Sequence, residues 1–334
     1  MTETSKMQIV SQVLALVALV TVLELGLLTA LLSGLLIYQL VQLTLPPLRR
    51  LGVAHGTGRT IALAVPAGIL IVAATLGVAQ IIALTTGPDS LARLLEMMAD
   101  VIGTARQYLP MWAHSYLPSN IADIQSLAAG WLQEHAGQVG GVSQDVVRLV
   151  FHVVIGMIIG GLVSFHIGPA HPSEGPFAQA LTKRTVVLAG AFRHIVFSQV
   201  RISALNTAIT ATYLAIILPI MGVHLPLIKT MIAVTFIVGL LPVLGNLISN
   251  TVIVIVSLSV SPLIATSSLV FLVVIHKLEY FVNARIIGTR IRARAWELLV
   301  AMLVMEAAFG VTGLIAAPIY YAYLKDELSL RGLI

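Results

Sequence analysis

The chain has 334 residues, of which 58% are hydrophobic and only 10% are charged, and its formal net charge is +5. Water-soluble domains carry charge on roughly a quarter of their residues, so this composition excludes an ordinary soluble protein and indicates an integral membrane protein. The absence of cysteine excludes disulfides and thiolate metal sites. We therefore expect the lipid bilayer as the main partner and no nucleic acid.

Long apolar tracts follow one another along the chain, at 8–45, 61–84, 146–168, 202–220, 225–260, 262–276 and 296–324. A helical crossing takes about 20 apolar residues, so the first tract is too long for one crossing. Glu24 and Gly26 near its middle favour two spans joined by a tight turn over a single tilted helix. The tract lacks an A-x-A-like site and continues into further apolar sequence, so we expect no cleavable signal peptide.

Charges between the tracts predict the orientation, because cytoplasmic loops are rich in Lys and Arg. Residues 46–60 and 169–201 are basic, whereas 85–145 carries mostly acidic side chains. These signs place the N-terminus in the cytoplasm and 85–145 outside. The expected organisation is N-terminal transmembrane helices at 1–84, an extracytoplasmic helical segment at 85–145, and a transport core at 146–334 with a cytoplasmic helix at 173–200.

The outer segment contains two stretches, 91–102 and 121–132, in which apolar residues recur at helical spacing behind candidate N-cap residues. They predict two amphipathic helices, which could bury their apolar faces on the membrane surface or on a neighbouring subunit. The favoured interpretation is a small packed cap without a direct transport role.

Two apolar tracts contain helix breakers near their centres. Residues 236–250 read FIVGLLPVLGNLISN, with Gly239, Pro242 and Gly245, and the last tract contains Gly310, Gly313 and Pro318. Proline removes an amide donor, and glycine lets the backbone leave the helix. The loop charges require the tract at 225–260 to enter and leave on the outer side. The last tract either enters and leaves on the inner side or crosses once.

Bare backbone is not tolerated against lipid, so each break must be buried in protein or line a wet cavity. Interrupted segments at two places are a pointer to the binding site of a transporter, although kinks also arise for packing alone. The sequence thus predicts an all-α, polytopic membrane fold with about six full spans and two re-entrant helical hairpins.

Polar residues within the apolar tracts are the candidates for a transport path. Glu306 lies one turn before Gly310, where a desolvated carboxylate can carry a proton or accept a cation. Glu279 at the inner boundary is a candidate for an ion pair or a gate. The amide side chains can bind a polar solute or satisfy freed backbone groups, although hydrogen bonding between helices is their commoner use; they are Gln199, Asn206, Asn246 and Asn250.

Other patterns limit the chemistry. The chain has no G-x-x-x-x-G-K-[ST], no H-E-x-x-H, and no acid pair spaced for hydrolysis within the spans, so we expect neither an enzyme nor a catalytic site, cofactor or metal. Five histidines lack metal spacing and are more typical of interfacial positions than of ligands, although one can act as a pH sensor; they are His152, His166, His194, His224 and His276. Small residues at Ala30, Gly34, Gly156 and Gly160 allow close helix contacts, within the chain or in a homo-oligomer.

Several of these elements together resemble the AI-2E family of permeases. They are Gln199, MGVHLP at 221–226, LLPVLGN, RIIG at 285–288 and FGVTGLIAAPIYYAYLKDEL. Pro242 and Gly245 match the family's Pro-x-x-Gly, while Ser198, Val243 and Ala284 depart from its usual residues. The family includes exporters of the quorum signal autoinducer-2 and sodium/proton antiporters.

The resemblance implies a multi-pass protein of the bacterial cytoplasmic (inner) membrane. We expect a secondary permease that exports a small polar metabolite or signal, such as autoinducer-2, with proton coupling. Exchange of sodium or lithium for protons and a channel-like oligomeric pore are the alternatives. A membrane scaffold without flux is a third.

Overall fold

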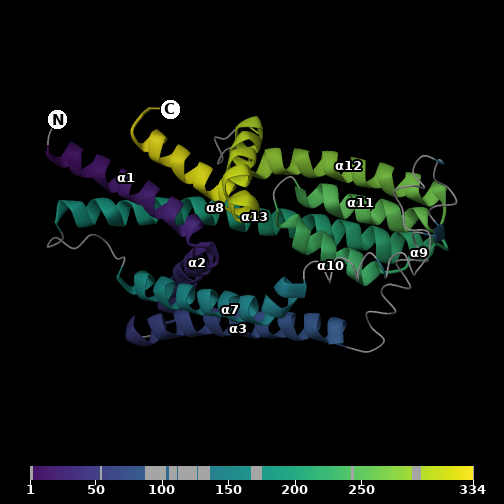
Figure 1. Cartoon of the computed structure of the whole chain (residues 1–334), viewed down its shortest axis with the longest axis horizontal. Coiled ribbons are helices and arrows are strands. Elements are labelled where there is room, and N and C mark those ends of the chain that lie inside the picture. Colours follow the sequence, from purple (N-terminus) through teal and green to yellow (C-terminus); the bar gives the residue numbers. More distant parts are fainter. Residues whose placement is uncertain are drawn as a thin grey trace. The chain divides into compact units, whose positions relative to one another are not determined.

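The computed structural model describes residues 3–52, 55–86, 136–166, 175–241, 244–287 and 295–333, together with residues 103, 104, 111 and 126. The described residues form helices, as the sequence predicts (Figure 1). Five of the described helices are long and apolar enough to cross a membrane, and several shorter ones are also apolar. The chain is therefore a multi-pass membrane protein.

The helices have the following bounds: α1 Glu3–Glu24, α2 Leu28–Arg50, α3 His55–Thr86, α7 Ala136–His166, α8 Pro176–Thr212, the π-helical turn η1 Tyr213–Ile217, α9 Leu218–Ile220, α10 Ile228–Gly239, α11 Leu244–Leu258, α12 Pro262–Ile287 and α13 Ala295–Leu330.

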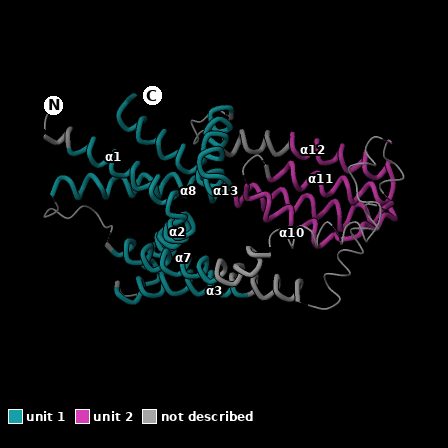
Figure 2. Tube along the Cα trace, in the orientation of Figure 1, with its two compact units in different colours: residues 1–76, 142–197, 291–334 teal, residues 77–141, 198–290 magenta. Residues whose placement is uncertain are grey.

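The chain divides into two compact units, which Figure 2 colours separately. Unit 1 comprises residues 1–76, 142–197 and 291–334, and unit 2 comprises residues 77–141 and 198–290. Both units therefore combine segments that are distant in sequence. The amphipathic helices predicted at 91–102 and 121–132 lie outside the described residues, apart from residue 126.

In unit 1, the first apolar tract forms two helices. Helix α1 ends at Glu24, and α2 begins at Leu28. Between them Gly26 has φ +67, a left-handed conformation that glycine adopts without steric cost. The break lies where Glu24 and Gly26 predict it, and both helices qualify as candidate spans.

Small residues bring α2 and α7 into backbone contact within unit 1. A Cβ atom added at Gly156 would lie 2.1 Å from the carbonyl oxygen of Ala30, and one added at Gly160 would lie 2.1 Å from that of Gly34. The Ser33 hydroxyl also donates to the carbonyl of Val153 at 3.2 Å. The small residues that the sequence singles out thus face one another inside a single chain.

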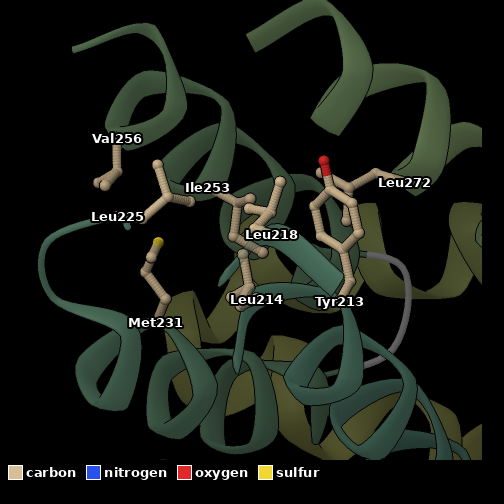
Figure 3. Packing of buried hydrophobic residues seen from close by; sticks show 8 residues of the cluster. All are labelled: Tyr213, Leu214, Leu218, Leu225, Met231, Ile253, Val256 and Leu272. Atoms are coloured by element: carbon tan, nitrogen blue, oxygen red, sulfur yellow. The ribbon is translucent and has the colours of Figure 1, made fainter. Parts of the chain in front are cut away.

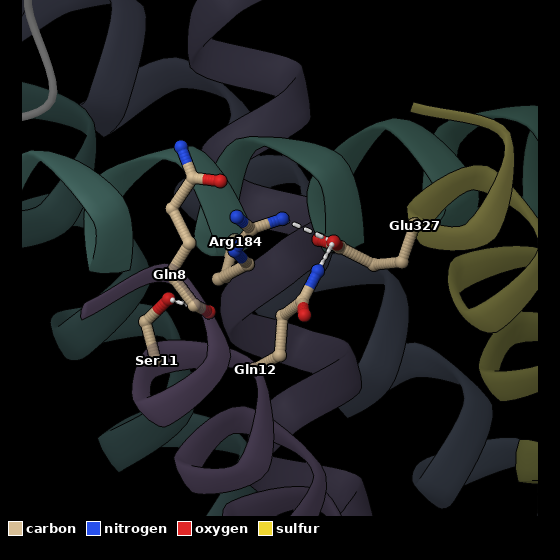
Figure 4. A network of polar contacts seen from close by, with 5 residues as sticks. All are labelled: Gln8, Ser11, Gln12, Arg184 and Glu327. Carbon is tan, nitrogen blue, oxygen red and sulfur yellow. Dashed lines mark hydrogen bonds and ion pairs between the residues drawn. The ribbon is translucent and has the colours of Figure 1, made fainter. Parts of the chain in front are cut away.

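A buried ion pair joins three helices of unit 1 (Figure 4). Arg184 of α8 pairs with Glu327 of α13, and both residues are 5% exposed. Gln12 of α1 donates its amide Nε2 to the same carboxylate at 2.9 Å. A buried charge pair is costly to break by removing one partner, so this contact fixes how α1, α8 and α13 meet.

Helix α13 folds back on itself at Gly310. This residue has φ 61 and ψ −145, which is not helical. Across it, Glu297 Oε2 accepts hydrogen bonds from Tyr321 and Lys325, both at 2.6 Å. Residues 24 positions apart would be about 36 Å apart in a straight helix, so these contacts require two arms packed side by side.

Unit 2 contains a second pair of packed arms, α10 and α11, and α11 in turn packs against α12. A Cβ atom added at Gly245 would lie 2.4 Å from the carbonyl oxygen of Val238, so the two arms touch at the backbone. Buried apolar side chains fill the space between the helices (Figure 3); they are Tyr213, Leu214, Leu218, Leu225, Met231, Ile253, Val256 and Leu272.

Candidate functional site

One face of α8 meets the end of α10 inside unit 2. Gln199, Ser203 and Asn206 follow one another at spacings of four and three residues, so they lie on the same face of the helix. Gln199 Nε2 donates to the carbonyl oxygen of Gly239 at 2.7 Å. Ser203 Oγ donates to the carbonyl oxygen of Phe236 at 2.6 Å. Two side chains of α8 thus bind the backbone at the point where α10 ends.

The backbone explains why these donors are needed. The chain leaves α10 through tightened turns, in which Leu240 N donates to Ile237 O at 3.2 Å and Leu241 N to Val238 O at 2.9 Å. The last carbonyls of a helix lack their usual partners and must be satisfied by other groups. Side chains of α8 supply these partners in an apolar interior.

An amide chain continues from the same face. Asn206, which is 7% exposed, donates Nδ2 to Asn246 Oδ1 at 2.9 Å. Asn246 Nδ2 lies 3.3 Å from Nδ1 of His276. The amide chain therefore joins α8, α11 and α12, and its middle member, Asn246, directly follows Gly245.

A cluster of hydroxyl groups lies further along unit 2. The Tyr213 hydroxyl lies 3.0 Å from the Ser268 hydroxyl and 3.2 Å from that of Ser267. Ser257 and Ser268 are 2.9 Å apart and fully buried. Tyr213 also stacks on Phe271 and begins the π-helical turn. Such turns inside α-helices occur frequently at functional sites.

The amide chain and the hydroxyl cluster both include side chains from one face of α8. Asn206, Thr210 and Tyr213 again follow at spacings of four and three residues, so polar side chains continue along this face over about 21 Å from Gln199. On this face the hydroxyl of Thr210 is buried and has no hydrogen-bond partner among the described residues. A buried unsatisfied hydroxyl costs about 1–3 kcal/mol, so this face is suited to take up water or a polar solute.

The electrostatic character of this face is neutral. Its members are amides and hydroxyls, and the amide chain ends at the exposed residue His276. Among the described residues no group of three or more His, Cys, Asp or Glu side chains could hold a metal ion. The arrangement can exchange hydrogen bonds with an uncharged polar molecule without burying a charge.

The structure brings together three of the side chains that the sequence singles out, namely Gln199, Asn206 and Asn246. Asn250 lies one turn beyond Asn246 on α11 and is half-buried. Glu279 belongs to α12, but its side chain lies outside the described residues, and so does Pro242.

The remaining candidates belong to unit 1. Glu306 is exposed on α13, and within the described part of the chain it makes no hydrogen bond or ion pair. Gly310 and Gly313 form the fold-back of α13, where a Cβ atom at Gly313 would lie 1.9 Å from the carbonyl oxygen of Met305. Pro318 is fully buried in the second arm.

Sequence reasoning missed Ser203, Thr210, Tyr213, Ser257 and Ser268. The repeat of polar residues at spacings of four and three from 199 to 213 was a usable signal, because it marks one helix face. The serines of α11 and α12 carry no such signal, since their partners are set by how the helices pack.

The family comparison matches nearly the whole chain. A family model described as AI-2E family transporter matches residues 9–329. The chain belongs to the AI-2E transporter family. Membership confirms the family that the sequence resembles and makes the chain a membrane transporter, which is consistent with the expectation that it is not an enzyme. No curated protein and no solved structure matches the chain.

Proposed function

We propose that this AI-2E family member is a secondary permease whose solute path follows the polar face of α8 in unit 2. The observation that carries the proposal is the contact of Gln199, Ser203 and Asn206 with the end of α10 and the start of α11. Non-helical backbone at membrane depth persists only where protein buries it or where it lines a cavity. Neutral side chains that bind such backbone can also bind a passing solute.

The lengths of α10 and α11 support a re-entrant arrangement. The two helices have 12 and 15 residues, which corresponds to about 18 and 23 Å, whereas the hydrocarbon core is about 30 Å thick. In the proposal, α10 and α11 enter and leave from the outer side. The two arms of α13 enter and leave from the cytoplasmic side, in a bacterial inner-membrane protein with a cytoplasmic N-terminus.

The chemistry of the path favours an uncharged solute rich in hydroxyl groups. The polar groups of the α8 face are amides and hydroxyls, and they offer both donors and acceptors. Autoinducer-2, the solute of the exporters for which the family is named, is the first candidate. Export against a gradient requires a driving force, which we propose to be the proton gradient.

The proposal is tested by flux in proteoliposomes with an imposed pH gradient, an internal pH dye and a panel of autoinducer-2, other small polyols, sodium and lithium. We expect proton movement that depends on a polar solute. Gln199→Leu and Asn206→Leu should lower it at least about tenfold, which corresponds to about 1.4 kcal/mol.

Thr212→Val is the matched control, because Thr212 lies exposed on the same helix and bonds only within it. Movement driven by sodium or lithium alone would instead identify a cation/proton exchanger. Leak that ignores the gradient would identify a pore, and silence across the whole panel would contradict transport of these solutes.

A further inference from the structure

The amide chain and the hydroxyl cluster cross unit 2 at two heights along α8. At the first, Asn206 of α8 donates to Asn246 of α11 at 2.9 Å. At the second, the Tyr213 hydroxyl of α8 lies 3.0 Å from that of Ser268, which lies 2.9 Å from that of Ser257 on α11. The two heights are seven residues apart on α8, which corresponds to about 10 Å.

Between these heights α8 carries a hydroxyl group that has no partner. Thr210 lies one turn beyond Asn206 and one turn before Tyr213, on the same face of the helix. It is 1% exposed, and its buried Oγ1 makes no hydrogen bond within the described part of the chain. A helical threonine can donate to the carbonyl four residues before it, as Thr212 does to Ala208 at 2.8 Å. The hydroxyl of Thr210 does not use even this partner.

Helix α11 carries an amide at the corresponding position. Asn250 follows Asn246 by four residues, as Thr210 follows Asn206, and both helices run from the amide chain towards the hydroxyl cluster. Asn250 is also one turn before Ile253, which is 1% exposed in the apolar cluster of Figure 3. The face of α11 that carries Asn250 therefore packs inside unit 2. Asn250 is half-buried and makes no hydrogen bond to another described residue.

We propose that Thr210 and Asn250 form a binding subsite for an uncharged solute that carries hydroxyl groups. This inference rests on the proposed permease function and names the contacts and the class of solute within its path. The threonine hydroxyl supplies one donor and two acceptor lone pairs, and the asparagine amide supplies two donors and an acceptor. Together they can bind a solute hydroxyl in either direction.

The surroundings of the subsite select against charge. Helix α11 contains no Asp, Glu, His, Lys or Arg, and the polar face of α8 from 199 to 213 consists of amides and hydroxyls. Burying an unpaired charge costs far more free energy than burying a hydroxyl group. A carboxylate or an ammonium group on the solute would find no counter-charge on the two helices that form the subsite.

The unpaired hydroxyl of Thr210 predicts a signature that separates a binding role from a structural one. A buried hydroxyl without a partner destabilises the free protein, and a solute that bonds to it removes this penalty. Removing the hydroxyl should therefore stabilise the free protein and weaken binding, as is common for residues of binding sites. A hydroxyl that held the fold together would instead cost stability when removed.

The deciding variant is Thr210→Val, because it replaces the hydroxyl with a methyl group of similar shape. The midpoint of thermal unfolding in nanodiscs, without solute, should rise by about 2 °C. The dissociation constants of autoinducer-2 and of ribitol, an uncharged polyol, should both rise about tenfold. Thr210→Ser keeps the hydroxyl and should bind both solutes within about threefold of the wild-type protein.

Thr44→Val is the matched control. Thr44 is half-buried in α2 of unit 1, and its hydroxyl donates to the carbonyl of Leu40 at 2.9 Å. This variant should not raise the unfolding midpoint, and it should leave both dissociation constants unchanged.

Two further measurements test the second contact and the class of solute. Asn250→Leu keeps the size of the side chain without its amide, and it should also weaken binding of both solutes about tenfold. It keeps the inference testable if Thr210→Val does not fold. Ribonate, which has the carbon chain of ribitol with a carboxylate at one end, should bind the wild-type protein at least about tenfold more weakly than ribitol.

The inference is overturned if Thr210→Val binds both solutes as the wild-type protein does, or if the wild-type protein binds neither. A lowered unfolding midpoint of Thr210→Val, or equal binding of ribonate and ribitol, would also overturn it. If solutes cross proteoliposomes equally well with and without the Thr210 hydroxyl, the subsite fails and the proposed function stands. If no solute crosses but binding depends on Thr210, the proposed function fails and the subsite stands.

Discussion

Both units contain a pair of packed helical arms, the two halves of α13 in unit 1 and α10 with α11 in unit 2, but the arms are held together differently. In unit 1 the arms of α13 are tied by a charged contact of Glu297 with Lys325 at 2.6 Å. In unit 2 the junction of α10 and α11 is held by neutral donors of a third helix, as with Gln199 on Gly239. A salt bridge between partly buried side chains favours one arrangement of the two arms. A neutral hydrogen bond can be exchanged for one to another partner at little cost in free energy.

The comparison teaches where movement and recognition belong in the proposed permease. The arms of α13 suit a fixed element, because removing either charge leaves the other uncompensated. The junction of α10 and α11 suits the solute site, because a hydroxyl-rich solute can replace one neutral partner by another.

The largest effect is expected from alanine at the glycines that let the arms touch. At Gly313 a Cβ atom would lie 1.9 Å from the Met305 carbonyl, and at Gly245 it would lie 2.4 Å from that of Val238. Neither backbone atom can move aside, so Gly313→Ala should cost about 3 kcal/mol or more and Gly245→Ala somewhat less. Thermal unfolding in nanodiscs measures both.

Gly190→Ala is the matched control for these variants, because nothing lies within 4 Å of its added Cβ atom. This variant should be as stable as the wild-type protein, or more stable by up to about 1 kcal/mol, because alanine has a higher helix propensity than glycine. Equal stability of all three variants would show that the arms do not touch as described.

The next effect is expected from breaking the charged tie of α13. Glu297→Gln should destabilise unit 1 by about 1–3 kcal/mol, because the side chains of Glu297 and Lys325 are only 19% exposed and the lysine loses its partner. Solute selectivity should not change. Unfolding curves measure the loss of stability, and competition assays between solutes measure the selectivity. Glu24→Gln, on the exposed end of α1, is the control. A change in selectivity would remove the distinction between the fixed and the exchanging hairpin.

A smaller loss of stability with a clear loss of flux is expected from Gly239→Ala. The added Cβ atom would lie 2.7 Å from the Ser203 hydroxyl, a side-chain atom that can rotate away. The protein should lose the bond to Phe236 and about 1 kcal/mol of stability. Flux should fall although the protein still folds. Thr251→Val, on the exposed face of α11, is the control and should change neither flux nor stability. Unchanged flux would place the solute path elsewhere.

The smallest effect is expected from Glu306→Gln. Glu306 is exposed on α13, so its replacement should change stability by less than about 0.5 kcal/mol. Flux should persist, because the proposed solute path lies along α8 in unit 2. Loss of coupling in this variant would assign the role to the carboxylate of α13, as the sequence predicts.

Much of the fold could be predicted from local patterns. Gly26 and Gly310 end or bend helices because their backbone conformations have positive φ, and this preference belongs to the residue itself. The candidate site was predictable only in part. Gln199, Asn206 and Asn246 are recognisable as polar residues in apolar tracts, whereas Ser203 is unremarkable until its hydroxyl meets Phe236.

The sequence by itself determined the membrane class, the all-helical character, the breaks at Gly26 and Gly310 and the family, because hydropathy and glycine conformation act over a few residues. The tertiary structure decided which small residues pair, as Gly160 does with Gly34, and which hydroxyls cluster, as those of Tyr213 and Ser268 do. These pairings depend on the rotation and crossing of helices distant in sequence. Packing of many side chains sets them together, and no local pattern encodes the result.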